Sequence, residues 1–244
     1  MTVALVSLKA YFGHARTLEW FEGLARLVEA GHAEGVRVVL APAATALASL
    51  APRAEELGIE LAAQDCSVHP AGAWTGELPA SLLAELGARH VMVGHVERRR
   101  LGEDDAVVAA KVEAAVAAGL GPVLCVGEPE EGPPAEAARY VLAQLEAARL
   151  PEGRPALVAY EPVWAVGADR PAPAAHVRAV LERLAPWRAA RPEVAVVYGG
   201  TAGPGTVEQI RDVVDGLGLG RRVHDVPALA EVLDELRSSI GGTP

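Results

Sequence analysis

A chain of 244 residues is long enough to bury a substantial core, either as one large domain or as two small ones. Its net charge of −10, with no basic run beyond Arg98-Arg99-Arg100, argues against a nucleic-acid-binding surface. No apolar run reaches membrane-spanning length and Met1 leads straight into a predicted strand, so we expect a cytoplasmic protein without a signal peptide or membrane span. Cys66 and Cys125 lie in or beside apolar runs, and we expect reduced core thiols rather than a disulfide.

Short apolar runs alternate with longer amphipathic segments along the whole chain. Most of these runs are continuous, as expected for parallel strands that are covered on both faces. The predicted strands are Val3–Leu8, Val36–Ala41, Ile59–Ala63, His90–Gly94, Pro122–Val126, Ala156–Tyr160, Val194–Tyr198 and Leu217–Leu219. The predicted helices are Thr17–Ala30, Ala44–Leu57, Pro79–Leu86, Asp104–Ala118, Ala135–Ala148, Ala174–Ala190, Thr206–Val214 and Pro227–Ser239. Pro186 should kink or split the helix that contains it.

The strand–helix units average about thirty residues each, which is the length of a βα repeat. No linker or compositional break divides them, so we predict an α/β fold in which residues 1–244 form one (β/α)8 barrel domain. An open, doubly wound sheet is the main alternative, but no Gly-x-Gly-x-x-Gly turn follows the first strand. In a barrel, the chemistry should lie where strands run into helices.

Candidate functional groups follow five of the predicted strands directly. They are Lys9, His95, Glu161, Gly199-Gly200-Thr201 and Gly220-Arg221, after the first, fourth, sixth, seventh and eighth strands. Because the C-terminal ends of the strands meet at one face of a barrel, the sequence predicts a single site there.

Glu161 is followed by Pro162 and by an apolar loop, residues 163–166, that ends at Gly167. An apolar loop beside a carboxylate is typical of a lid that closes over it and excludes water. Such a carboxylate can act as a general base toward a carbon next to a carbonyl group. The alternatives are a surface turn in which Trp164 only fills a gap, and a strand-end carboxylate in which Glu161 is paired with an arginine.

His95 could polarise a carbonyl oxygen and move a proton between the oxygens of an enediolate, although a lone histidine is often structural. Lys9 offers a positive charge for an anionic substrate, and Lys111 is the only other lysine among 22 basic residues. We expect Lys111 to lie on a solvated helix face. Glu97 and Arg98 should orient loops or pair across a subunit boundary.

The glycine-rich turns Gly199-Gly200-Thr201 and Gly218-Leu219-Gly220 fit a phosphate site, because glycines let backbone N–H groups approach an anion. Residues with metal-ligand spacing and the glycine patterns of nucleotide sites are absent from the sequence. We therefore expect no metal and no cofactor.

These motifs together resemble the triosephosphate isomerase family, from the first strand to the last helix. The segments that carry the resemblance are Ala159–Gly167, Val93–Arg99, Leu124–Glu128, Ala73–Glu77 and Tyr198–Gly200. The resemblance implies a TIM barrel and a cofactor-free aldose–ketose isomerase. Its substrates would be small phosphorylated sugars of the dihydroxyacetone phosphate and glyceraldehyde 3-phosphate type, converted through an enediolate.

The resemblance also implies a role for each matching residue. Glu161 would be the base, His95 the electrophile, Lys9 the partner of the substrate's charge and Glu97 a supporting acid. The phosphate would be held by Gly167, Thr201 and Gly220. Family members are usually dimers whose third loop docks into the neighbour. Here that loop is Gln64–Leu78, so the resemblance implies a homodimer in which Thr75, beside Trp74, approaches the partner's site.

Three departures from the family pattern change the surroundings of the substrate. The family's Asn-x-Lys is Ser7-Leu8-Lys9 here, the serine after the catalytic histidine is Val96, and the last Gly-Gly is Gly220-Arg221. Ser7 is shorter than asparagine and leaves room, or a hydroxyl group, beside the reacting carbons. Arg221 could grip the phosphate or pack outward against Asp225.

Two alternatives therefore remain beside a triose phosphate substrate. One is a four-carbon ketose phosphate, such as an erythrulose phosphate. The other, from a different functional class, is a catalytically inactive barrel that binds a phosphorylated metabolite without turnover. The presence of Glu161, His95 and Lys9 together argues against a catalytically inactive barrel, because binding alone needs no base.

Overall fold

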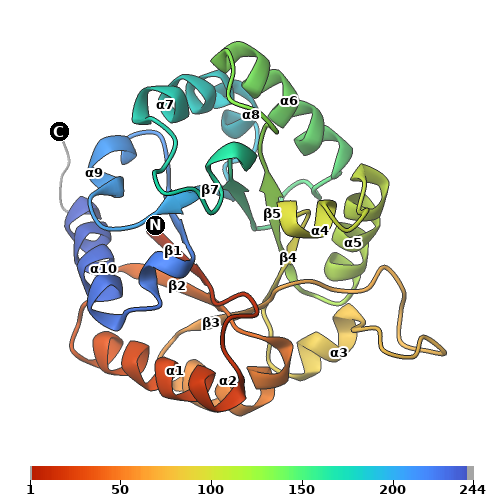
Figure 1. Cartoon of the computed structure of the whole chain (residues 1–244). Coiled ribbons are helices and arrows are strands. Elements are labelled where there is room, and N and C mark those ends of the chain that lie inside the picture. Colours follow the sequence, from red (N-terminus) through yellow and green to blue (C-terminus); the bar gives the residue numbers. More distant parts are fainter. Residues whose placement is uncertain (1, 241–244) are drawn as a thin grey trace.

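The computed structural model describes residues 2–240, and its strands form a closed parallel barrel in sequence order (Figure 1). The strands are β1 (Thr2–Ser7), β2 (Val36–Ala41), β3 (Glu60–Ala63), β4 (His90–Val93), β5 (Gly121–Val126), β6 (Ala156–Tyr160), β7 (Val194–Ala202) and β8 (Gly216–Leu219). The barrel closes where β1 pairs with β8, with Val3 opposite Gly216 and Val6 opposite Leu219. The predicted (β/α)8 barrel is confirmed.

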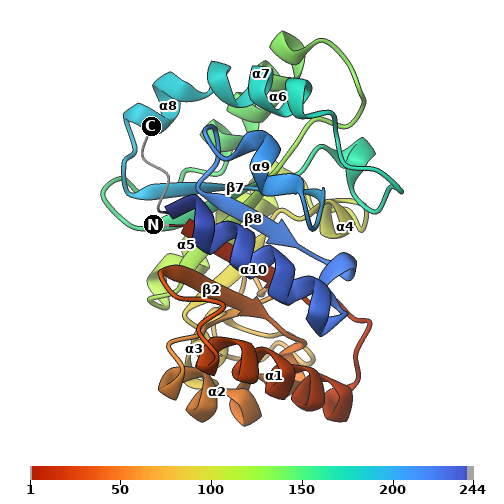
Figure 2. The same ribbon diagram turned by 90° about the vertical axis from the view of Figure 1, so that its left-hand side faces the viewer.

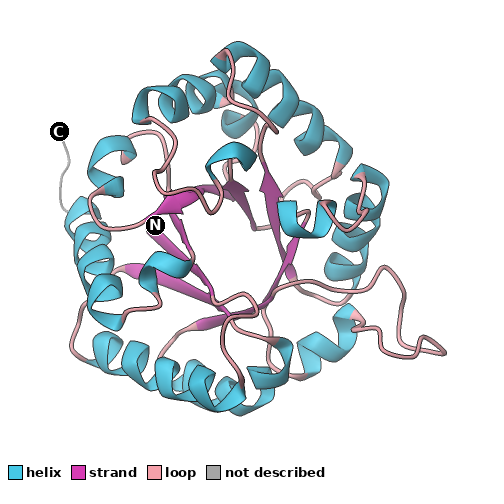
Figure 3. Ribbon diagram, viewed as in Figure 1, coloured by secondary structure: helices cyan, strands magenta, loops and turns pink. Residues whose placement is uncertain are grey.

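Helices form a ring around the strands (Figure 3). They are α1 (His14–Glu29), α2 (Leu47–Glu56), α3 (Ala80–Glu85), α4 (Val96–Arg99), α5 (Asp105–Ala117), α6 (Pro134–Ala147), α7 (Ala174–Arg183), α8 (Ala185–Ala189), α9 (Thr206–Ile210) and α10 (Val226–Ile240). Short 3₁₀ turns lie at η1 (Ala44–Ala46), η2 (Val163–Ala165) and η3 (Arg221–Val223). In residues 2–240 we find no helix with the length and apolar character needed to cross a membrane.

The helix predicted over residues 174–190 is divided, as the proline within it led us to expect. The chain leaves α7 after Arg183, and Pro186 stands in the first turn of α8, where its missing N–H costs no helical hydrogen bond. The short helix α4 was not predicted, because four residues are too few to show a helical period.

The barrel strands are buried on both faces. Along β1, Val3 and Leu5 belong to the cluster inside the barrel, whereas Ala4 and Val6 pack with the surrounding helices. This double burial explains why the strands appear in the sequence as continuous apolar runs. Helix α10 packs outside β1, next to the seam where β1 meets β8 (Figure 2).

Both cysteines are buried free thiols, as predicted. Cys125 lies inside the barrel and Cys66 in the outer cluster. Burial raises the pKa of the Cys66 thiol to about 12. Both side chains therefore serve as small apolar core residues.

Lys111 does not lie on a solvated helix face, and that expectation is wrong. Its exposed fraction is 4%, and its Nζ lies 2.6 Å from Asp65 Oδ1 and 2.6 Å from Glu103 Oε1. Arg98 Nε reaches the same two carboxylates, at 2.9 Å from Asp65 and 2.7 Å from Glu103. Two acidic groups from separate loops thus meet at the inner face of α5, where a buried lysine neutralises them. The expected loop-orienting role of Arg98 agrees with these contacts.

Candidate active site

A cavity of about 380 Å³ opens at the C-terminal ends of the strands. All the site residues predicted from the sequence line it: Ser7, Lys9, His95, Glu97, Glu161, Gly167, Thr201, Gly220 and Arg221. They come from the ends of β1, β4, β6, β7 and β8, which the barrel brings together. The structure therefore joins in one cavity residues that lie far apart in the sequence.

Glu161 stands at the end of β6, where its backbone N–H donates to the Val126 carbonyl at 2.7 Å. Its side chain is packed so closely against Gly199 that a Cβ atom there would lie 2.6 Å from the Glu161 Cγ. Burial raises the pKa of Glu161, against the opposing charges of His95 and Lys9. A buried carboxylate with a raised pKa is suited to accepting a proton near neutral pH.

His95 caps the short helix α4, and Gly94 before it has a φ of 73°, which turns the chain out of β4. The Glu97 backbone N–H donates to His95 Nδ1 at 3.1 Å. In a neutral ring the proton is therefore on Nε2, which lies 3.4 Å from Glu161 Oε2. His95 can thus present an N–H donor beside the Glu161 carboxylate.

Lys9 is held in place from two directions. Its φ of 48° is uncommon for a residue with a side chain, and Gln64 Nε2 donates to its carbonyl at 3.0 Å. Its Nζ donates to Glu97 Oε1 at 2.6 Å. Burial opposes ionisation of Glu97, but the hydrogen bond and charge of Lys9 outweigh it and lower the pKa of that carboxyl. A paired lysine and carboxylate thus border the cavity beside His95.

The loop after Glu161 lies over the site and is bonded to the end of β7. The Gly167 N–H donates to Thr201 Oγ1 at 3.1 Å, and that hydroxyl donates to the Ala165 carbonyl at 2.6 Å. Further along the loop, the Ala172 N–H donates to Tyr198 Oη at 2.9 Å. These contacts join the predicted lid segment to the end of β7, at the border of the cavity.

The glycine-rich segments predicted as turns after the seventh and eighth strands lie mostly within the strand ends, because β7 runs to Ala202 and β8 to Leu219. Pairing between β7 and β8 is irregular between residues 198 and 202, so β7 extends past Tyr198 with a distorted backbone. Gly167, Thr201, Gly220 and Arg221 all line the cavity. Within residues 2–240 we find no ion pair between Arg221 and Asp225, and Arg221 faces the cavity instead.

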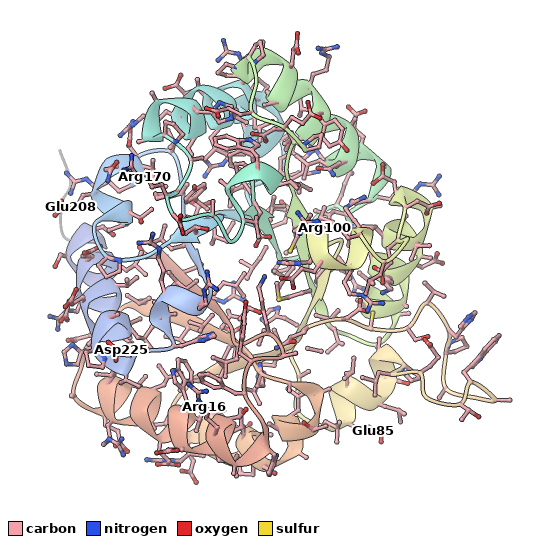
Figure 4. The ribbon with its side chains drawn as sticks, viewed as in Figure 1. Arg16, Glu85, Arg100, Arg170, Glu208 and Asp225 are labelled. Atoms are coloured by element: carbon pink, nitrogen blue, oxygen red, sulfur yellow. The ribbon has the colours of Figure 1, made fainter. Side chains whose placement is uncertain are left out.

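Four other polar or charged side chains line the cavity and were not predicted as site residues: Tyr11, Arg100, Asp169 and Arg222. Arg222 Nη2 donates to the Asp169 carbonyl at 2.6 Å and so joins η3 to the lid segment. Figure 4 shows Arg100 at α4, beside the mouth of the barrel. The available signals were the doubled arginine at 221–222 and the basic run Arg98-Arg99-Arg100, neither of which by itself indicates a site.

Comparisons with known proteins agree with this geometry. The family model for triosephosphate isomerase matches residues 2–236. L-erythrulose-1-phosphate isomerase of Pectobacterium atrosepticum is 40% identical over 242 residues, covering 94% of this chain and 93% of the relative. Triosephosphate isomerase of Symbiobacterium thermophilum is 44% identical over 184 residues, covering 70% and 71%.

The solved structures give the same result. The crystal structure of triosephosphate isomerase from Bartonella henselae superposes with a TM-score of 0.83 and 28% identity, over 97% of this chain and 100% of that one. The match therefore extends over the barrel and the loops that surround the cavity. This chain belongs to the triosephosphate isomerase family and is an isomerase.

Proposed function

We propose that this isomerase interconverts small ketose and aldose phosphates, and that it handles a four-carbon ketose phosphate as well as or better than dihydroxyacetone phosphate. The observation that carries the proposal is the presence of Ser7 and Arg221 in the same cavity as Glu161 and His95. The name of the Pectobacterium relative, L-erythrulose-1-phosphate isomerase, supports a four-carbon substrate.

In the proposed reaction, the ionised Glu161 carboxylate takes a proton from the carbon next to the substrate carbonyl. The electron pair of that C–H bond forms the enediolate, and the carbonyl oxygen accepts a hydrogen bond from His95 Nε2. His95 then passes a proton between the two oxygens, and Glu161 returns its proton to the neighbouring carbon. No atom is gained or lost, so the side chains suffice and no cofactor is required.

Lys9 and Glu97 take supporting roles in this proposal. The Lys9 ammonium group adds positive charge next to the developing oxyanion. Glu97 fixes that ammonium group through the 2.6 Å hydrogen bond. Exclusion of water by the lid would strengthen the interaction of Lys9 with the oxyanion, whereas the Glu97 side chain remains 51% exposed.

The phosphate would lie between the lid and the C-terminal ends of β7 and β8. Gly167, Thr201 and Gly220 supply the backbone and hydroxyl groups at this side of the cavity. Arg221 adds a cation that suits a phosphate dianion. We therefore assign Arg221 to phosphate binding rather than to outward packing.

Ser7 supports the longer substrate. Ser7 lines the cavity and is 9% exposed, so in this proposal its hydroxyl group would meet the substrate away from bulk solvent. Because serine is shorter than the family's asparagine, it leaves space for one more carbon and offers a hydroxyl group to the added oxygen.

We also propose a cytoplasmic homodimer of single-domain subunits, with residues 1–244 as the domain. The loop Gln64–Leu78 extends away from the barrel between β3 and α3 (Figure 1). It carries Trp74, which is 46% exposed, and Leu78, which is 45% exposed. Large exposed apolar side chains on a projecting loop favour a protein contact. The free thiols support a reducing compartment.

A substrate panel at equal enzyme concentration tests the substrate proposal. Dihydroxyacetone phosphate and an erythrulose phosphate are each incubated in deuterated solvent, and both product and deuterium incorporation are measured. We expect turnover of both, with kcat/KM for the four-carbon substrate equal or higher. Rapid turnover of the triose with none of the tetrulose would reject the four-carbon assignment, and exchange of neither would reject the isomerase mechanism for these substrates.

A further inference from the structure

A buried carboxylate outside the cavity joins three segments of the chain. Glu128, just after β5, is 3% exposed. It accepts hydrogen bonds from Tyr160 Oη at 3.1 Å, from Trp164 Nε1 at 3.0 Å and from His176 Nε2 at 2.8 Å. An ionised carboxylate only accepts, so all three partners donate to it.

These three donors flank the lid on both sides. Tyr160 is the last residue of β6 and directly precedes Glu161, Trp164 lies in η2 at the front of the lid, and His176 lies in α7 behind it. The indole of Trp164 and the imidazole of His176 meet edge-on, with ring centroids 5.4 Å apart and planes at 81°. Figure 1 shows η2 and α7 connected by the lid's rear segment. One carboxylate thus ties the front of the lid to its back.

We propose that His176 is a positioning residue that holds the lid closed through Glu128. The inference rests on the role proposed above for Glu161 and its lid, but it assigns a residue outside the cavity. His176 and Trp164 both donate to Oε1 of Glu128, so the first turn of α7 is fixed relative to η2. Loss of the imidazole removes that link and leaves a buried carboxylate oxygen with one donor fewer.

Loss of the His176 imidazole should weaken the hydrogen bonds that join the lid to β7. With α7 no longer tied to η2, the bonds from Gly167 to Thr201 and from Ala172 to Tyr198 should break more often. Glu161 would then be open to water for a larger fraction of the time, and the rate of proton transfer would fall.

Hydrogen–deuterium exchange by mass spectrometry on the full chain tests this coupling without any substrate. The variants are His176→Leu, which removes the donor, and His176→Gln, whose amide nitrogen can replace it. We expect exchange in residues 162–173 to be about tenfold faster in His176→Leu and close to wild type in His176→Gln. Peptides from the barrel strands should be unchanged in both variants.

A control tests whether loss of any imidazole–carboxylate contact has the same effect. His32, between α1 and β2, pairs with Asp234 of α10 at 2.9 Å between Nδ1 and Oδ2, in a more exposed setting (32% and 39%) than His176 with Glu128 (9% and 4%). His32→Leu should leave exchange of residues 162–173 unchanged. Wild-type lid exchange in His176→Leu, or an equal rise in lid and strand peptides, would overturn the proposal.

Kinetics supply a second readout. His176→Leu should lower kcat about tenfold, with His176→Gln restoring most of it, because the imidazole acts on closure and not on the reacting atoms. A second variant, Trp164→Phe, removes the other donor to Oε1. Its effect on kcat should be less than additive with that of His176→Leu, and full additivity would contradict action through the same carboxylate. If the wild type converts neither sugar phosphate, the substrate proposal fails while the exchange experiment still decides the role of His176.

Discussion

His95 Nε2 lies 3.4 Å from Glu161 Oε2 in a cavity where the two residues are only 7% and 8% exposed. One residue ends β6 and the other follows β4 after a single glycine, so the contact depends on closure of the barrel. The arrangement places a proton donor and a proton acceptor side by side, away from bulk water. A substrate carbonyl and its neighbouring carbon can therefore meet both groups at once.

The Glu161→Gln variant tests the base directly. Glutamine keeps the shape of the side chain but cannot accept the proton, so kcat should fall by about 10² to 10⁴-fold while phosphate binding remains. Steady-state kinetics and competition by inorganic phosphate measure the two effects. Near-full isomerisation by this variant would remove Glu161 from the proposed mechanism.

The raised pKa of Glu161 predicts the acid side of the pH profile. Burial raises this pKa above its ordinary value of 4.5, and only the ionised carboxylate can act as the base. Therefore kcat/KM should fall as the pH drops, with a midpoint above 4.5 in the free enzyme. The profile must be measured within the range where the protein stays folded. A rate that is constant down to pH 4.5 would be inconsistent with a buried base.

Much of this site could be predicted from the sequence because most key residues lie at or just beyond the end of an apolar strand. Parallel strands buried on both faces give continuous apolar runs, and barrel closure then gathers the residues that follow them. The roles of Lys111 and His176 could not be predicted. Their partners Asp65 and Glu128 lie 46 and 48 positions away, and only the packed structure shows those pairs. Neither residue belongs to a local pattern that would indicate burial.

We expect a second carboxylate, Glu60, to contribute to the pH dependence of stability in acid. Glu60, at the start of β3, accepts hydrogen bonds from His90 and from Arg37, the latter at 2.8 Å from both Nε and Nη2. Burial opposes its ionisation, but these bonds outweigh it and lower the pKa of Glu60 from 4.5 to about 2. Its stabilisation is therefore complete above pH 4.5 and is lost as the pH falls toward 2.

Glu60→Gln should lose this contribution, about 2 to 3 kcal/mol at neutral pH, and should show a weaker decline in the free energy of unfolding between pH 4.5 and pH 3. Urea unfolding at several pH values measures it. Glu56→Gln is the control, because Glu56 is 65% exposed in its pair with Arg53 and should change stability by less than about 1 kcal/mol. Equal changes in the free energy of unfolding for the two variants would show that the Glu60 hydrogen bonds stabilise the fold no more than an exposed ion pair does.

A substitution in the projecting loop tests whether the proposed dimer forms through it. Trp74→Glu places a charge on the loop Gln64–Leu78 and should weaken association and activity together, if Thr75 of one subunit completes the other's site. Tyr140→Glu is the matched control, because Tyr140 is 47% exposed on α6, away from this loop. Sedimentation velocity and specific activity at several concentrations measure the outcome. A fully active wild-type monomer would exclude the dimer requirement.

The last prediction concerns substrate choice. Ser7 and Arg221 line the cavity, and both differ from the family's asparagine and second glycine. Restoring asparagine at position 7 should return an amide near the oxygens of a triose and fill the space that a fourth carbon would occupy. Restoring glycine at position 221 should remove the bulky cation beside the phosphate.

The double variant Ser7→Asn with Arg221→Gly should therefore shift the ratio of kcat/KM toward dihydroxyacetone phosphate. One transition-state hydrogen bond gained or lost corresponds to about 1 to 3 kcal/mol, or roughly a ten- to hundredfold change in that ratio. Arg222→Gly serves as the control, since Arg222 bonds to the lid at Asp169 and should affect both substrates alike. A double variant with the wild-type ratio would mean that neither residue selects the substrate. If the wild type also turned over only the triose, the plain triosephosphate isomerase assignment would stand, because the cavity would then discriminate through groups common to the family.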